Sequence, residues 1–233
     1  MTKKLNVPFV ELESRDLDTA LEMDGARFDV DQVNWPETFP YAPFCSGRIA
    51  RTKDALVVDF RVSGLDLRAQ NTEDNGRQWE DSCVELFIEA PDGSSYYNFE
   101  INALGKVLAC TGASREGRVK RPKEEMEQIL RFAQNDSFAQ NDSFAQNDGG
   151  SRCDPEEAKP AKDLQGLHSW RVCVAIPFRL IGMDAEHLPE KIRANFYKCG
   201  DKTAHPHFVS WSPVYTEKPD FHRPEFFGEL YLV

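Results

Sequence analysis

Two tryptophan-bearing segments hold the residues of this chain that are best suited to chemistry. Residues 77–89 read RQWEDSCVELFIE, and residues 207–230 read HFVSWSPVYTEKPDFHRPEFFGEL. Trp79 and Trp211 stand at predicted loop–strand junctions, where an aromatic face can stay open to a ligand. Acidic, amide and basic side chains surround them. A flat apolar ring beside planar polar groups matches the C–H face and the hydroxyls of a sugar better than it matches a reacting substrate.

Short alternating strands must position these segments. The alternation of apolar and polar residues is clearest over residues 55–64, 82–90, 96–102, 170–178 and 228–233. Turn-forming residues separate these runs. We therefore expect an all-β fold, an antiparallel β-sandwich of the jelly-roll or immunoglobulin-like kind, as a single domain over residues 1–233. Helical patterns are expected only over residues 122–132 and near residues 179–183.

One hairpin can be predicted in register. If Asp92-Gly93 is a two-residue turn, residues whose numbers sum to 185 face each other. The apolar residues of the two strands then share one face, and Glu85 lies directly opposite Glu100 on the other. Like charges in that relation destabilise a sheet. A cation such as Lys198, a bound metal ion, a shared proton or the hydroxyls of a ligand would offset them, unless both carboxylates are solvated.

Residues 111–167 differ in composition from the rest of the chain. They are charged and polar, and they contain FAQNDS twice and FAQND once over residues 132–148. So few copies of a weakly apolar unit cannot stack into a core. We interpret residues 111–167 as a long inserted loop of low complexity without fixed structure. A functional polar arm is the alternative.

Charge and cysteine usage exclude some classes of partner. Lys and Arg total 28 against 39 Asp and Glu, and the net charge of −11 opposes binding to nucleic acid. Neither an apolar run long enough for a membrane span nor a secretory signal is recognisable, so a cytoplasmic location without membrane contact is the default expectation. The six cysteines lack zinc-ligand spacing, which favours reduced, buried thiols. We expect a monomer.

The longest motifs resemble carbohydrate-binding module family 9, above all its bacterial family-9-like group. The resemblance rests on residues 77–102 and on the segments NFYKCGD, PHFVSWSP and PDFHRPEFFGELYL, and it covers about residues 30–110 and 168–233. It implies a β-sandwich related to DOMON domains that binds carbohydrate without catalysis. It also implies a terminal sugar held between two tryptophans and calcium bound in a structural role.

The resemblance also assigns roles to single residues. Trp79 and Trp211 match the two clamp tryptophans, Glu85 matches a ligand-binding glutamate, and Asn102 matches a sugar-binding asparagine. Glu100 departs from the family pattern, which has an arginine there, so the identity of the sugar is left open. The same resemblance identifies residues 111–167 as an expanded loop.

Beyond these matches, the residues themselves indicate further contributors to a sugar site. Glu100 is expected to bond hydroxyls together with Glu85 and Asn102, and Lys198 is expected to offset the two carboxylates. Arg223 follows Asp220 and His222 in a nearby loop, from which it would reach the ligand.

Three other functions are compatible with the sequence. Glu85 and Glu100 would serve as the paired carboxylates of a glycoside hydrolase. A haem or redox role, as in some DOMON relatives, would draw on methionines and on the segment His205-Pro206-His207. Exposed aromatic side chains would also suit a protein interface. Calcium ligands cannot be named, because no EF-hand-like spacing occurs.

Overall fold

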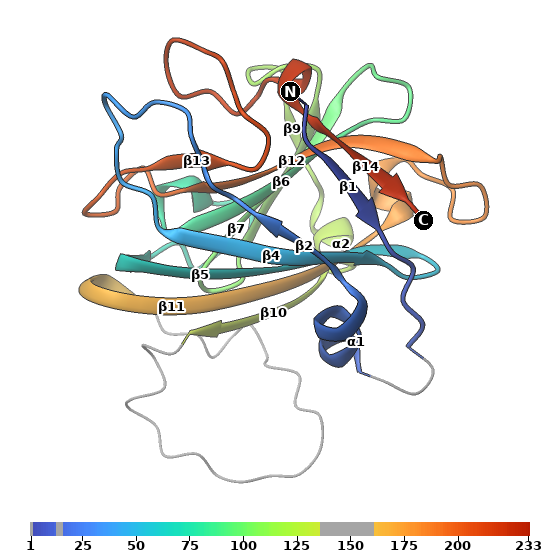
Figure 1. Ribbon diagram of the computed structural model, residues 1–233, viewed down its shortest axis with the longest axis horizontal. Helices are drawn as coiled ribbons and strands as arrows, with labels where there is room; N and C mark the ends of the chain where they lie inside the picture. Colours follow the sequence, from blue (N-terminus) through green and yellow to red (C-terminus); the bar gives the residue numbers. More distant parts are fainter. Residues whose placement is uncertain (1, 13–15, 136–160) are drawn as a thin grey trace, which may run out of the picture.

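Two β-sheets packed face to face form the body of the protein (Figure 1). The computed structural model describes residues 2–12, 16–135 and 161–233. The larger sheet contains, in spatial order, β1 (Lys4–Val7), β14 (Gly228–Leu232), β12 (Lys191–Cys199), β6 (Cys83–Glu89), β7 (Tyr96–Asn102), β8 (Val107–Gly112) and β9 (Val119–Lys120). Two further strands extend it from β12, namely β13 (Phe208–Ser210) and β3 (Gln32–Val33). This architecture confirms the predicted β-sandwich.

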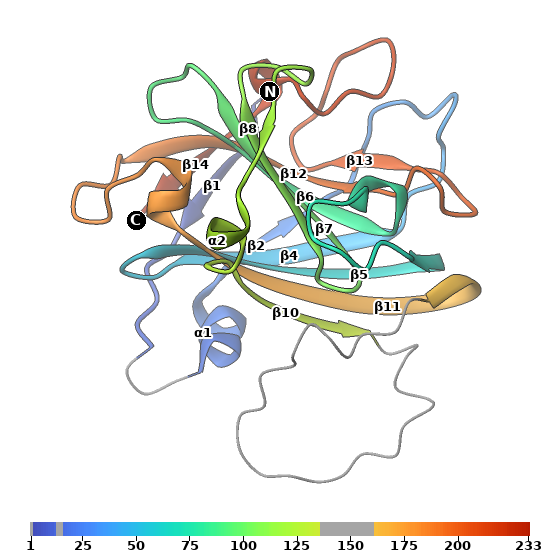
Figure 2. The same ribbon diagram turned by 180° about the vertical axis from the view of Figure 1, so that it is seen from behind.

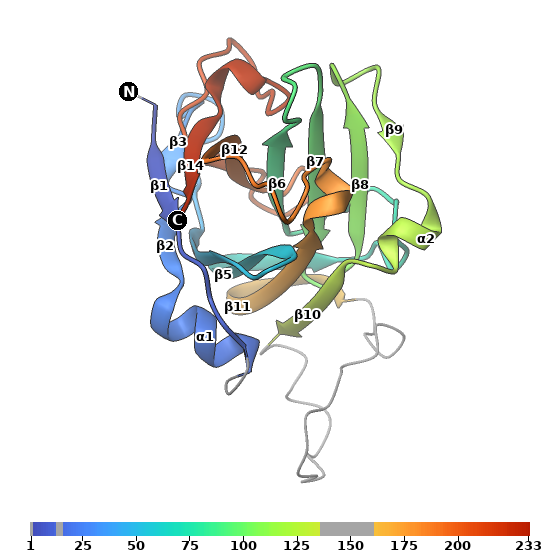
Figure 3. The ribbon, with the colours of Figure 1, turned by 90° about the vertical axis from the view of Figure 1, so that its right-hand side faces the viewer.

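The smaller sheet lies across one face of the larger one (Figure 3). Its order is β10 (Leu130–Asn135), β11 (Ala161–Pro177), β5 (Ala55–Ala69), β4 (Phe44–Arg51) and β2 (Ala26–Asp29). The helical elements are α1 (Leu17–Asp24), α2 (Lys123–Met126), and the 3₁₀ helices η1 (Gln78–Glu80), η2 (Phe178–Ile181) and η3 (Pro224–Phe226). All strand pairs in the two sheets are antiparallel except β1 with β14.

Alternation along each strand decides which side chains fill the sandwich. On β6, Val84, Leu86 and Ile88 are fully buried in the core between the sheets. Each such side chain contributes about 1.5–3 kcal/mol on burial. The residues between them face the other way, onto the outer face of the larger sheet, because successive side chains of a strand alternate. That outer face carries the site described below.

The predicted register of the β6–β7 hairpin is confirmed. Glu85 pairs with Glu100, and Val84 pairs with Ile101, as the sum rule requires. The connection is longer than predicted, because Ala90 already bonds to Ser95 (N to O, 2.8 Å) and residues 91–94 form the turn. The register is nevertheless the predicted one, because the observed turn is centred on the same peptide bond as the predicted turn.

A second apolar cluster covers the outer face of the larger sheet. It includes Phe87, Tyr96 and Tyr197 from the strands, with Phe221 and Phe227 from the segment between β13 and β14. Phe221 stacks on Tyr197 with ring centroids 4.1 Å apart. The sequence between β13 and β14 is therefore fixed against the sheet by its aromatic side chains.

The interpretation of residues 111–167 as one unstructured loop was wrong at both ends. After β8, the chain forms β9, α2 and β10, and β10 pairs with β11, which begins at Ala161 (Figure 2). The expected helix over residues 122–132 ends at Met126, and the chain is extended again from Leu130. Residues 132–135 of the first FAQNDS copy lie in β10, and the later copies fall outside the described residues. Within the described part of the chain, no helix has the length and apolar content needed to cross a membrane.

Candidate functional site

A pocket of about 130 Å³ lies on the outer face of the larger sheet. Its floor is formed by Glu85, Glu100 and Cys199, which come from β6, β7 and β12. Three loop segments surround this floor. They contribute Trp79, then Arg115 and Arg118, then Pro219, Asp220, Phe221 and His222, while Asp201 and Phe208 complete the lining.

Two buried glutamates form the polar centre of the pocket. Glu85 is 4% exposed and Glu100 is 3% exposed. One carboxylate oxygen of Glu100, Oε1, accepts hydrogen bonds from Asn98 Nδ2 (2.9 Å) and Arg118 Nη1 (3.3 Å). Its other oxygen, Oε2, is buried and has no hydrogen-bond donor among the residues that the structure describes. Glu85 Oε1 accepts from the thiol of Cys199 at 3.0 Å.

Burial raises the pKa of both carboxyl groups. Burial is the largest cause for Glu85, and the charge of Glu100 raises the pKa of Glu85 further. For Glu100, the nearby Arg118 guanidinium partly counteracts the effect of burial on the pKa. A neutral carboxyl group can donate a hydrogen bond, whereas a carboxylate only accepts. A pair that retains a proton near neutral pH therefore offers both a donor and an acceptor to a polar ligand.

Trp79 supplies an aromatic surface beside these carboxyl groups. It lies in η1 and is half-buried against the outer apolar cluster. Its position is fixed by the backbone, because Asp201 N donates to Trp79 O (3.0 Å) and Lys202 N donates to Glu80 O (3.1 Å). The pocket thus combines an aromatic side with hydrogen-bonding groups, as small polar ligands with apolar faces require.

His222 closes another side of the pocket and stays neutral. Its Nδ1 lies 2.9 Å from the hydroxyl of Tyr96. Burial, followed by the charges of Arg118 and Arg115, lowers the pKa of His222 to about 2. This imidazole is a hydrogen-bonding group here and not a cation. The backbone N of His222 donates to Asp220 Oδ1 at 3.1 Å.

Comparison with known proteins identifies the family. The model of carbohydrate-binding family 9 matches residues 16–149 and 152–232. The chain belongs to this family. The resemblance seen in the sequence motifs is thereby confirmed. A comparison with curated proteins finds no match.

Solved structures agree with this family assignment. A candidate carbohydrate-binding protein from Bacteroides uniformis ATCC 8492 is 31% identical over 100% of both chains, with a TM-score of 0.84. A family 9 module from Caldicellulosiruptor kristjanssonii in complex with glucose is 11% identical, with a TM-score of 0.51, over 99% of this chain and 96% of its own. The same kind of module with cellotriose is 10% identical, with a TM-score of 0.52, over 99% and 93%. At these low identities the Caldicellulosiruptor structures establish likeness of fold.

Trp211, which the family 9 resemblance assigns as the second clamp tryptophan, lies in the core and does not line the pocket. Its side chain is 4% exposed and contacts Phe196, with ring centroids 5.4 Å apart. Gly228 makes room for it, because a Cβ at that glycine would lie 2.3 Å from the indole. The aromatic side chains that line the pocket together with Trp79 are Phe208 and Phe221.

Lys198 does not offset the carboxylate pair, and this expectation was wrong. It pairs with Val84 across β12 and β6, so its side chain leaves the sheet on the opposite face from Glu85. Its Nζ donates to Cys199 O (2.6 Å) and lies 2.8 Å from Nε2 of His207. The cation next to the pair is Arg118, whose Nη1 lies 3.3 Å from Glu100.

Asn102 and Arg223 also lie outside the pocket lining. Asn102 is fully buried, and its amide bridges Asp81 Oδ2 (3.0 Å) and the backbone N of Lys106 (3.0 Å), which stabilises the turn after β7. Arg223 Nε donates to Asp220 Oδ2 at 2.7 Å. Asn102 therefore has a structural role in this conformation, and the side chain of Arg223 reaches the pocket lining through its bond to Asp220.

Sequence reasoning missed the two arginines of the pocket. Arg115 and Arg118 lie between β8 and β9, inside the region interpreted as an unstructured insertion. A signal was present, because residues 115–121 read REGRVKR and form a basic cluster in an acidic protein. Composition alone did not indicate that this cluster would fold back onto the sheet.

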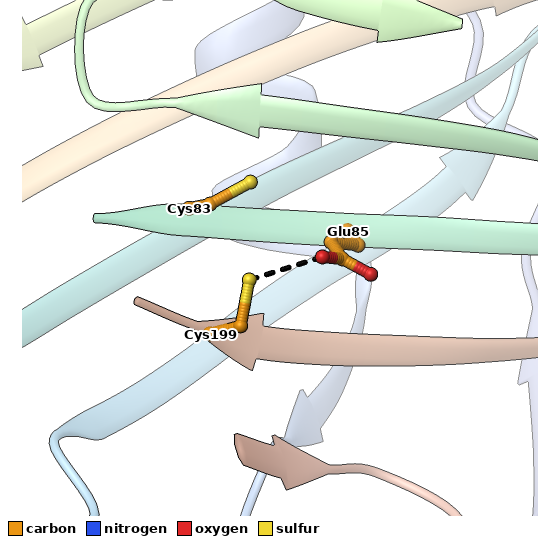
Figure 4. Close-up of side chains that lie close together, drawn as sticks. All are labelled: Cys83, Glu85 and Cys199. Carbon is orange, nitrogen blue, oxygen red and sulfur yellow. Dashed lines mark hydrogen bonds between the residues drawn. The ribbon is translucent and has the colours of Figure 1, made fainter. Parts of the chain in front are cut away.

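Three potential metal ligands meet next to the floor of the pocket, and two of them, Glu85 and Cys199, line it. The ligand atoms of Cys83, Glu85 and Cys199 all lie within 4.8 Å of one another (Figure 4). The five cysteines within the described residues are free and buried, as expected. Calcium prefers oxygen ligands, so this cluster is not the structural calcium site that the resemblance implies, and calcium binding stays a prediction.

Proposed function

We propose that this protein binds carbohydrate without catalysis, and that one sugar residue occupies the pocket beside Trp79. The observation that carries the proposal is the buried Oε2 atom of Glu100, for which the described part of the chain supplies no hydrogen-bond donor. A buried polar atom without a partner costs about 1–3 kcal/mol. A sugar hydroxyl would supply the missing donor, and the indole beside it would cover the apolar face of the ring.

Each group of the pocket has a role in this proposal. The face of Trp79 stacks on the C–H side of the sugar, and Glu85 and Glu100 exchange hydrogen bonds with its hydroxyls. Arg115 and Arg118 line the same pocket and provide further donors. Trp211 lies in the core and does not touch the ligand.

The size of the pocket favours a single sugar unit. Its volume of about 130 Å³ is small beside the roughly 300–1,000 Å³ of pockets for drug-sized ligands. A longer chain would place one residue in the pocket and leave the rest outside, so an end of the chain is the preferred ligand. Family 9 neighbours were solved with glucose and with cellotriose, which makes glucose and its β-linked oligomers the first ligands to test.

The absence of hydrolysis is part of this proposal, and the family and the surroundings of the two carboxyl groups support it. A glycosidase needs one carboxylate as a base or nucleophile that faces the reacting carbon. Here burial raises the pKa of both groups, and Glu100 is held by Asn98 and Arg118. Prolonged incubation with cello-oligosaccharides is expected to release no shorter products. Release that disappears in Glu85→Gln would establish the hydrolase instead.

Calorimetric titration of the full chain tests the proposal. Glucose, other monosaccharides and cello-oligosaccharides are titrated into the wild type, Trp79→Ala, Glu100→Ala and the control Arg223→Ala. We expect saturable binding in the wild type and control, and a loss of at least tenfold in affinity in the other two. Absence of binding by a folded wild type, for every sugar, would contradict the proposal.

A further inference from the structure

Strand register brings together Cys83, Glu85 and Cys199, of which Glu85 and Cys199 line the pocket floor. Cys83 and Glu85 are two residues apart on β6, so both side chains leave the same face of the sheet. Cys199 on β12 lies directly opposite Cys83. Cys83 is 0% exposed and Cys199 is 1% exposed. Three side chains of two types that coordinate metals, thiol and carboxyl, are thus held on strands and not on loops.

The spacing of these three side chains fits one metal ion. Zinc binds thiolate sulfur at about 2.3 Å and carboxylate oxygen at about 2.0–2.2 Å. Two sulfur ligands of a tetrahedral zinc ion are therefore about 3.8 Å apart. The three ligand atoms here lie within 4.8 Å of one another, and the Cys199 Sγ to Glu85 Oε1 distance is 3.0 Å. Small side-chain rotations would bring all three ligand atoms onto one ion.

The hydrogen-bond partners of Glu85 favour a bound cation. Its Oε1 accepts from a thiol, which is a weak donor, and a buried carboxyl group gains most from a metal or a strong donor. The nearest lysine on the neighbouring strand, Lys198, points to the other face and bonds to Cys199 O. Arg118 is held by Glu100. Glu85 therefore forms no ion pair with either of these two side chains, although the charge of Arg118 still lowers the pKa of Glu85 somewhat.

We propose that Cys83, Glu85 and Cys199 form a binding site for a thiophilic divalent cation, with zinc the best match. Thiolate ligands select zinc over calcium and magnesium, which take oxygen ligands. Two thiolates and one carboxylate carry three negative charges, and a bound zinc ion would reduce the net charge of the site to −1. Glu85 and Cys199 both line the pocket, so the fourth position of a tetrahedral ion faces the pocket. Water fills that position in the absence of other ligands, and a sugar hydroxyl replaces it when the pocket is occupied.

Metal titration without any sugar tests the site. The full chain, reduced by a non-thiol reductant and freed of metal, is titrated with Zn²⁺ against a chromophoric chelator and with Co²⁺ as a spectroscopic substitute. The Cys153→Ser background removes a thiol that lies outside the described residues. We expect one equivalent of metal to bind and cobalt to show the near-ultraviolet charge-transfer bands of thiolate coordination.

Matched variants locate the site. Cys83→Ser, Cys199→Ser and Glu85→Gln are each expected to lower zinc affinity at least tenfold. Cys110→Ser is the control, because Cys110 is also buried on the same sheet but lies outside the cluster. If a serine variant fails to fold, the cobalt spectrum of the parent protein still reports thiolate ligands directly. Cobalt binding without charge-transfer bands, or equal losses in the control, would overturn the proposal.

Sugar binding and metal binding can fail separately in these experiments. The zinc titration contains no sugar, so it measures the metal site alone. A sugar titration in the presence of chelator measures the pocket without metal. Zinc binding without any sugar response would leave the metal site standing and contradict the proposed function. Sugar binding by a chain that binds no zinc would support the proposed function and contradict the metal site.

Discussion

Alanine substitution of Trp79 and of Trp211 is expected to give opposite results, although the family 9 resemblance assigns both residues to the sugar clamp. Trp211 is 4% exposed and fills the core against Phe196. Truncating a buried tryptophan costs about 3–5 kcal/mol, a large share of the roughly 5–15 kcal/mol that stabilises a domain. Trp79 is half-buried at the pocket, so its truncation costs less stability. Loss of a stacked tryptophan at a binding site costs about 2 kcal/mol or more, which is about thirtyfold in affinity.

Urea denaturation and calorimetric sugar titration of the same samples measure both effects. Trp211→Ala is expected to lower the free energy of unfolding by about 3–5 kcal/mol and to leave the affinity of the folded protein unchanged. Trp79→Ala is expected to lose sugar affinity with the smaller stability change. Trp211→Phe, which keeps most of the apolar volume, serves as the milder control. A stable Trp211→Ala protein that no longer binds sugar would refute the assignment of Trp211 to the core.

Further predictions concern the polar groups of the pocket. Glu100→Gln is expected to lower sugar affinity about tenfold or more in calorimetry, because a hydrogen bond to a charged group contributes about 1.5–3 kcal/mol. Equal affinity in this variant would remove Glu100 from the site. Arg118→Met is expected to weaken sugar binding several-fold in the same calorimetry, since Arg118 lines the pocket and its Nη1 donates to Glu100 at 3.3 Å. For His222, the pKa is about 2 in the fold against 6.5 when unperturbed. Below pH 6.5 the unfolded state therefore binds more protons than the folded state. The free energy of unfolding decreases by about 1.4 kcal/mol for each unit by which the pH is lowered, and the total loss at pH 5 is about 2 kcal/mol. Denaturation at pH 7 and pH 5 should show that His222→Gln reduces this loss, and an identical loss in the variant would contradict the buried neutral histidine.

The β6–β7 hairpin was predictable because local rules determine it. A turn centred on Asp92-Gly93 and a strict two-residue alternation together fix which residues face each other. The observed pairing of Glu85 with Glu100 follows from these rules even though the turn is longer than expected. The two carboxylates of the site were located by sequence for this reason.

The cation beside the carboxylates was not predictable in the same way. The face to which Lys198 points depends on the register between β12 and β6, strands that are separated by about a hundred residues in sequence. No short turn fixes that register, and a shift of one residue would exchange Lys198 for Cys199 on the pocket face. Arg118 was missed because its segment is polar, and polar composition does not distinguish a mobile loop from one that folds over charged groups of the sheet.

Trp211 illustrates a further limit of motif matching. The segment PHFVSWSP marks the family, but the motif does not report side-chain direction at the end of a short strand such as β13. Trp211 N donates to Phe196 O at 2.8 Å, and Gly228 leaves space for the indole beneath the loop. Both contacts come from strands distant in sequence, so only the assembled fold places this tryptophan in the core.

A fluorescence titration tests the central claim, sugar binding at Trp79, most directly. Intrinsic tryptophan fluorescence of the wild type and of Trp79→Ala is followed during addition of glucose and cello-oligosaccharides, with the chain shown to be folded in both cases. We predict a saturable change in the wild type that is absent in Trp79→Ala. A wild type that responds to no sugar, or a Trp79→Ala protein that responds with unchanged affinity, would contradict the account.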